Sequence, residues 1–163
     1  MALLSVLIAL AAFGTILSAA VPVVRGLYAQ AAVEYEAVQL VGELRRIQAV
    51  SRMTAMPLSL FEGQIAWKRV PLLRIHPNGY TVSHPYNGIV YAHAPLPLVC
   101  FEQETKKNMP IVFDRNGGVG EASHNMTIRV YAVGCEDAVL RVVIDGAARI
   151  RLDRRAQDAA DEE

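Results

Sequence analysis

The first part of the chain is apolar without interruption. From Ala2 to Val24 there is no charged residue, and the only polar side chains are hydroxyls. A helix of this length is about 35 Å long, which is enough to cross the roughly 30 Å hydrocarbon layer of a bilayer. A core helix of a soluble domain would carry a polar stripe, and this segment has none. The pattern therefore predicts a membrane-spanning helix at residues 1–24.

A cleaved secretory signal is the alternative explanation of the same segment. Ser18 and Ala20 stand at positions minus three and minus one of a small-residue cleavage pattern, which would place the mature N-terminus at Val21. Against this alternative, no Lys or Arg precedes the apolar run, and the run is longer than the roughly 7 to 15 residues of a typical signal core. The helical pattern also continues beyond Pro22, which favours a retained helix.

The helical pattern becomes amphipathic over residues 25–56. Large apolar residues recur there at steps of three, at Val38, Val41, Leu44 and Ile47. Charged residues occupy other positions, and Pro57 supplies a stop. We therefore expect one long helix, with residues 1–24 in the membrane and residues 25–56 packed against the rest of the protein.

From residue 57 the period changes to that of β-strands, with turn residues at about every tenth position. Short strands are expected at 58–61, 65–70, 72–75, 80–83, 89–91, 98–101 and 111–113. An antiparallel meander is expected at 126–133, 139–144 and 148–152. The sequence thus predicts an α+β fold, in which the long N-terminal helix packs on an antiparallel β domain at 57–152. Residues 153–163 contain no large apolar side chain and are expected to form a disordered tail.

Composition and motifs narrow the range of functions. The chain of 163 residues is long enough for one globular unit, and its 16 basic residues balance 16 acidic ones. Without net charge, the protein as a whole has no attraction for nucleic acid. The sequence contains no Gly-x-Ser-x-Gly motif and no phosphate-binding loop, and its four histidines have no metal-ligand spacing. We therefore expect a non-enzymatic protein without a metal or cofactor.

Cys100 and Cys135 are the only cysteines of the chain. If the β domain lies outside the cytoplasm, these two residues are candidates for a disulfide, and two separate thiols are the alternative. Metal binding is disfavoured because the two do not form a Cys-x-x-Cys pair.

The uncharged run with Gly14 and Pro22, followed by an amphipathic helix and antiparallel strands, resembles the type IV pilin and pseudopilin superfamily. Mature chains of that superfamily often carry glycine at position 14 and proline at position 22, as this sequence does when counted from Met1. Segments of the helix end and of the last strands are similar to minor pseudopilins of the general secretion pathway H and FimT type, or to their competence counterparts. These segments are residues 44–52, 111–117 and 142–150.

The resemblance implies a structural subunit of a bacterial type II secretion, type IV pilus or competence filament. Its first helix would be a single-pass anchor in the inner membrane, with the β domain extracytoplasmic, and would pack into the filament core on assembly. The implied partners are other pilin-like subunits, an inner-membrane assembly platform and membrane lipid. A secreted β-rich domain behind a cleaved signal remains the alternative.

One position departs from the superfamily pattern. The usual glutamate at mature position 5 is Ser5 here, and a serine cannot form the ion pair that this glutamate is thought to make with the N-terminal amine of a neighbouring subunit. The departure fits a subunit at the filament tip. It equally fits a start that lies further upstream, because the basic leader of the superfamily is not in this sequence. We expect Ser5, Gly14 and Pro22 to lie in the assembly helix.

Four arginines follow the final hairpin. They are Arg149, Arg151, Arg154 and Arg155. One interpretation is a solvated strand edge, which basic side chains protect from pairing with another chain. The other is contact with DNA phosphates, which the resemblance to FimT-like pilins that take up DNA implies. The acidic residues that follow, from Asp158 to Glu163, oppose the second interpretation.

Overall fold

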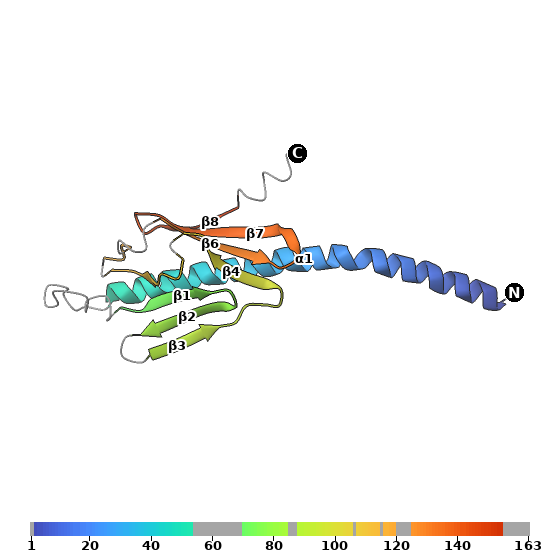
Figure 1. Cartoon of the computed structure of the whole chain (residues 1–163), viewed down its shortest axis with the longest axis horizontal. Helices are drawn as coiled ribbons and strands as arrows, with labels where there is room; N and C mark the ends of the chain where they lie inside the picture. The colour runs from blue at the N-terminus through green and yellow to red at the C-terminus, as the bar shows by residue number, and fades with distance from the viewer. Residues whose placement is uncertain are drawn as a thin grey trace.

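The computed structural model describes residues 2–53, 70–84, 88–105, 107–114, 116–119 and 125–154. Within these residues one long helix, α1 (Ala2–Met53), is followed by eight strands in two sheets (Figure 1). The N-terminal half of α1 projects away from the strands, whereas its C-terminal half lies along them (Figure 1). The predicted α+β fold, a long helix on antiparallel β-structure, is confirmed.

Helix α1 runs without a break through 52 residues, including Pro22. At about 1.5 Å per residue it is about 78 Å long, well over twice the roughly 30 Å thickness of a hydrocarbon layer. The predicted end at residue 56 lies outside the described residues.

The strands form two antiparallel sheets rather than one. The first sheet has the order β3-β2-β1-β5 and consists of β1 (Leu72–His76), β2 (Gly79–His84), β3 (Gly88–His93) and β5 (Ile111–Val112). The second has the order β4-β6-β7-β8 and consists of β4 (Val99–Gln103), β6 (Met126–Ala132), β7 (Cys135–Ile144) and β8 (Ile150–Asp153). The predicted C-terminal meander is thus present as β6, β7 and β8. The predicted strand at 58–61, and the predicted strand at 65–70 up to residue 69, lie outside the described residues.

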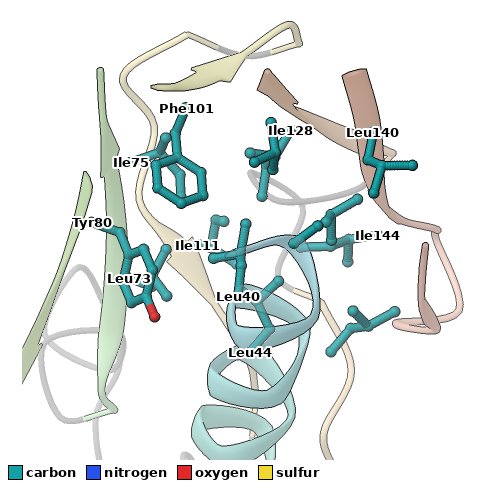
Figure 2. Packing of buried hydrophobic residues seen from close by; sticks show 14 of the residues in the cluster. Leu40, Leu44, Leu73, Ile75, Tyr80, Phe101, Ile111, Ile128, Leu140 and Ile144 are labelled. Carbon is teal, nitrogen blue, oxygen red and sulfur yellow. The ribbon is translucent and has the colours of Figure 1, made fainter. Parts of the chain in front are cut away.

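The core lies where both sheets meet the C-terminal half of α1. Alternate residues of β6 and β7 are buried, as expected for strands with one face on a core. Leu40 and Leu44 of α1 are fully buried, and they lie between Leu73 of the first sheet and Ile144 of the second (Figure 2). Because both sheets pack on the same helix, α1 is the element that joins them.

The buried face of α1 differs from the predicted one. Val38 is 54% exposed and Val41 is only partly buried, although Leu44 and Ile47 are buried as expected. Each step of three residues turns the helix face by about 60°, so three such steps carry Val38 to the side opposite Ile47. The buried positions observed along α1 recur mainly at steps of three and four residues, which keep them on one face of the helix. The apolar members of this stripe are Ala29, Ala32, Val33, Ala37, Leu40, Leu44 and Ile47.

Candidate assembly helix and basic groove

The N-terminal half of α1 makes no contact that buries it. Every described side chain from Leu4 to Val24 is exposed, although most are large and apolar. By length and composition this helix can cross a membrane, and its most apolar stretch buries nothing against the rest of the chain. A core helix of a soluble protein would be mostly buried, which this one is not. One apolar N-terminal helix of this kind is consistent with a single-pass membrane anchor.

Ser5, Gly14 and Pro22 all lie in this exposed half of α1. A Cβ built on Gly14 meets no atom within 4 Å, so no contact inside the chain requires glycine there. The hydroxyls of Thr15 and Ser18 donate to the carbonyls of the residues three positions earlier, at 2.8 and 2.9 Å. These internal bonds satisfy the hydroxyls without water, as a helix in lipid requires.

A buried carboxylate fastens the first sheet to the helix. Glu36 of α1 is 1% exposed, and its Oε2 lies 2.7 Å from Nε2 of His93 at the end of β3. Its Oε1 accepts the backbone N–H of Leu96 at 2.7 Å. Because both oxygens are engaged, the pair acts as a structural tie. Glu36 was not predicted from the sequence as a structural residue, although its place inside the apolar stripe was a signal.

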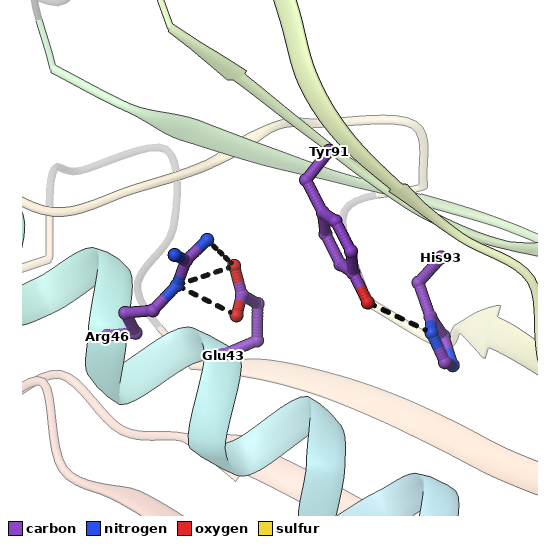
Figure 3. A network of polar contacts seen from close by, with 4 residues as sticks. All are labelled: Glu43, Arg46, Tyr91 and His93. Atoms are coloured by element: carbon purple, nitrogen blue, oxygen red, sulfur yellow. Dashed lines mark hydrogen bonds and ion pairs between the residues drawn. The ribbon is translucent and has the colours of Figure 1, made fainter.

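Aromatic side chains complete the surroundings of His93. The ring of Tyr80 stacks on the imidazole with centroids 4.7 Å apart, and the hydroxyl of Tyr91 lies 3.3 Å from Nδ1 (Figure 3). Burial raises the pKa of Tyr80 above its usual value, and its hydroxyl is buried without a hydrogen-bond partner among the described residues. On the nearby helix surface, Glu43 accepts hydrogen bonds from the Arg46 guanidinium at 2.7 to 3.1 Å (Figure 3).

A basic groove lies at the other end of the domain, between the end of α1 and the β7–β8 turn. Its cavity is about 650 Å³, and four arginines line it: Arg45, Arg52, Arg149 and Arg151. Gln48 of α1 joins the helix to the β7–β8 turn across the groove, because its Nε2 donates to the carbonyl of Ala148 at 3.1 Å, and it also donates to the carbonyl of Gly117 at 2.7 Å. The helix therefore contributes as many cations to this groove as the strands do.

Asp145 is the one acidic residue that lines the basic groove among the described residues. Its Oδ1 accepts the backbone N–H groups of Arg149 and Ala147, both at 2.9 Å. These hydrogen bonds, that from Arg149 first, lower the pKa of Asp145. Its Oδ2 also lies 3.2 Å from Nε of Arg149. The carboxylate shapes the β7–β8 turn and neutralises one of the four guanidinium groups.

The arginine cluster expected from the sequence is divided in the fold. Arg149 and Arg151 line the groove, but Arg154 pairs with Glu34 of α1 at 2.5 Å, and Arg155 lies outside the described residues. Arg45 and Arg52 were not predicted from the sequence as part of this cluster. Their spacing of seven residues, two helical turns, was the signal that could have placed both on one helix face.

Cys100 and Cys135 are free thiols in the structure, which agrees with the alternative of two separate thiols and not with the candidate disulfide. Cys100 lies in β4 opposite Tyr131 of β6, and Cys135 begins β7 opposite Ala132 of β6. Strand β6 thus separates the two cysteines, and strands two positions apart are about 10 Å apart. Cα atoms more than about 7 Å apart cannot be bridged without backbone movement.

No protein-family model matches the chain, and no curated protein matches its sequence. Two crystal structures of the type IV minor pilin FimU from Pseudomonas aeruginosa PAO1 are similar in fold. The first, in space group P65, has a TM-score of 0.52 at 14% sequence identity over 74% of this chain and 91% of that chain. The second, in space group P21, has a TM-score of 0.53 at 14% identity over 74% of this chain and 87% of that chain. The chain therefore has the type IV pilin-like fold that the sequence resemblance predicted.

Proposed function

We propose that this chain is a minor pilin-like subunit of a bacterial filament, of the general secretion pathway H and FimT type. The observation that carries the proposal is the exposed apolar half of α1, which continues directly into the buried half. Before assembly the exposed half crosses the inner membrane as a single span, and the β domain lies outside the cytoplasm. During assembly, through an inner-membrane platform, the same half leaves the lipid and packs against helices of other pilin-like subunits. Its work is structural rather than catalytic.

The side chains of the exposed half suit both environments. Large apolar residues such as Leu10 and Phe13 face outward, where either lipid tails or neighbouring helices can cover them. Small residues such as Ala12 and Gly14 let helix backbones approach closely. Ser5 carries no charge and needs no cation in the apolar layer, whereas a carboxylate at that depth would need one. This supports a place at the filament tip, where a subunit has fewer neighbours.

A truncation tests the proposed function. Removing residues 1–24 leaves the whole core, which begins at Ala29, so the variant is expected to fold and to be soluble. It is also expected to lose membrane association and to abolish one activity of the host, namely secretion, piliation or transformation. Which activity is lost identifies the machinery. An unchanged activity in all three assays would refute the proposal.

Contact with DNA is a second candidate function, which the basic groove supports. Its four arginines converge from α1 and the β7–β8 region on one groove, as phosphate binding requires. The intact chain in detergent should then retain duplex DNA at low salt. Changing Arg45, Arg52 and Arg151 together to alanine, the three groove arginines that Asp145 does not pair, should reduce the slope of log affinity against log salt by about 2.7, at about 0.9 per phosphate contact. Arg154→Ala, outside the groove, is the control, and no retention by the unsubstituted chain would end this candidate.

A further inference from the structure

Two loops expose large apolar side chains at one end of the domain. The loop between β3 and β4 exposes Leu96 by 37% and Leu98 by 38%, and the β6–β7 turn exposes Val133 by 50%. The loops touch, because the backbone N–H of Val133 donates to the carbonyl of Leu98 at 2.8 Å. We call Leu96, Leu98 and Val133 the apolar rim.

The apolar rim lies where the domain meets the exposed half of α1. The guanidinium of Arg25 is 3.2 Å from the point where a Cβ on Gly134 would sit, so the β6–β7 turn rests beside this residue. Arg25 is the first charged residue after the uncharged run. Figure 1 shows the β6–β7 turn and the connection into β4 at the end of the domain that faces the N-terminus of α1.

The β3–β4 loop is held firmly in the conformation that exposes its leucines. Leu98 has a φ of 75°, a left-handed conformation that bulky side chains seldom adopt. The backbone N–H of Val99 donates to the carbonyl of Leu96 at 3.1 Å, and the N–H of Leu96 donates to buried Glu36 at 2.7 Å. A segment held in this way has little conformational freedom left to lose on binding.

We propose that the apolar rim rests in the interfacial layer of the membrane that α1 crosses. This inference rests on the proposed function, because it takes the exposed half of α1 as the span. The headgroup layer on each side of a bilayer is about 5 to 8 Å thick. From Arg25 to Ala29, the first buried residue, the helix rises about 6 Å, so the β6–β7 turn beside Arg25 lies within the headgroup layer, together with Leu98, whose carbonyl is hydrogen-bonded to that turn.

The chemistry of the surrounding residues fits a lipid surface. Arg25 stands at the level of lipid phosphates, and half-exposed Tyr28 stands where aromatic side chains gather at membrane interfaces. Glu136 and Asp137, exposed at the start of β7, disfavour a strongly anionic surface and favour zwitterionic headgroups. The rim would fix the tilt of the domain on the membrane before assembly, and the domain would lift away when α1 leaves the lipid.

Depth-dependent fluorescence quenching tests the rim in the full chain. In a Trp67→Phe background, tryptophan is placed singly at Leu96, Leu98 or Val133 and the protein is reconstituted in phosphatidylcholine vesicles. Lipids brominated close to the headgroup should quench all three rim tryptophans strongly. Ile89→Trp is the matched control, because Ile89 is also apolar and 67% exposed but lies in β3 outside the rim, and it should not be quenched.

Phe13→Trp separates the inference from the proposed function. Deep quenching at Phe13, together with rim tryptophans no more quenched than Ile89→Trp, would overturn the rim proposal and leave the anchor intact. Absence of quenching at Phe13 would overturn both. A third outcome is that lipid does not quench the rim tryptophans, and that they are shielded from aqueous acrylamide only at a high protein-to-lipid ratio. This would show that the rim contacts a second copy of the chain, and it would overturn the proposal. Three independent positions guard against one variant that fails to fold.

Discussion

Among substitutions of a single polar residue, replacing Glu36 should lower the stability of the domain most. Glu36→Ala removes two hydrogen bonds to a buried carboxylate, from the backbone of Leu96 and with His93. It also leaves Nε2 of His93 and the N–H of Leu96 without the carboxylate that they contact, although Nδ1 of His93 keeps the Tyr91 hydroxyl. Hydrogen bonds to charged groups contribute about 1.5 to 3 kcal/mol each, and breaking a buried pair costs about 3 to 5 kcal/mol. We therefore expect the free energy of unfolding to fall by about 3 to 5 kcal/mol.

Urea unfolding of the variant lacking residues 1–24, followed by tyrosine fluorescence, measures this loss. With an m-value of about 2 kcal/mol/M, the midpoint should shift by about 1.5 to 2.5 M. Glu43→Ala is the matched control, because it removes a carboxylate two helical turns away whose side chain is 13% exposed and whose partner Arg46 is 60% exposed. A pair with one solvated partner contributes about 1 kcal/mol or less. Equal, small shifts for the two variants would refute the role assigned to Glu36.

Three further changes have expected outcomes. Tyr80→Phe should hold or raise stability at neutral pH, because the buried hydroxyl has no hydrogen-bond partner among the described residues. Burial raises the pKa of Tyr80 in the folded state, so the unsubstituted protein loses stability as the pH rises above about 10, where tyrosine ionises in the unfolded chain. The variant should therefore lose less stability than the unsubstituted protein between about pH 10 and 11 in urea titrations. Gly14→Leu should leave folding and membrane association unchanged but block filament assembly. Gly42→Leu is the comparison, because a Cβ at Gly42 also meets no atom within 4 Å; it tests whether a bulky side chain at any open glycine of α1 blocks assembly. Gly117→Ala should cost about 1 to 2 kcal/mol in unfolding free energy, because its φ is 75° and the added Cβ would displace the Arg52 guanidinium.

The elements that depend on local pattern were predictable from the sequence. An uncharged run can be assigned from composition alone, and the strand pattern in 126–133 and 139–144 predicted β6 and the second part of β7. Strand β7 begins at Cys135, four residues before the predicted start, because Glu136 and Asp137 near its start are polar and exposed and so show no alternation. The division of the strands into two sheets was not predictable, because β4 reaches β6 by a crossover that no local pattern records. The same holds for the cysteines, whose separation depends on the strand between them.

The candidate site was only half predictable, for a physical reason. Arg149 ends the β7–β8 turn and Arg151 lies in β8, so sequence proximity identifies both. Arg45 and Arg52 join them only because α1 packs beside the β7–β8 turn. Arg154 is close in sequence yet is turned to Glu34 by that same packing. Proximity along the chain therefore predicted a basic cluster, but only two of the four arginines that form the groove.

The composition of purified filaments tests whether the exposed half of α1 brings the chain into a filament. Filaments sheared from cells that express the full chain, the variant lacking residues 1–24 or Gly14→Leu are collected, and the chain in each is measured by quantitative mass spectrometry. The full chain should be present in filaments in a small, reproducible amount, and neither variant should be present, although both fold. Filaments that contain the truncated chain as readily as the full one, or a free exported protein whose N-terminus is Val21, would contradict this role of α1.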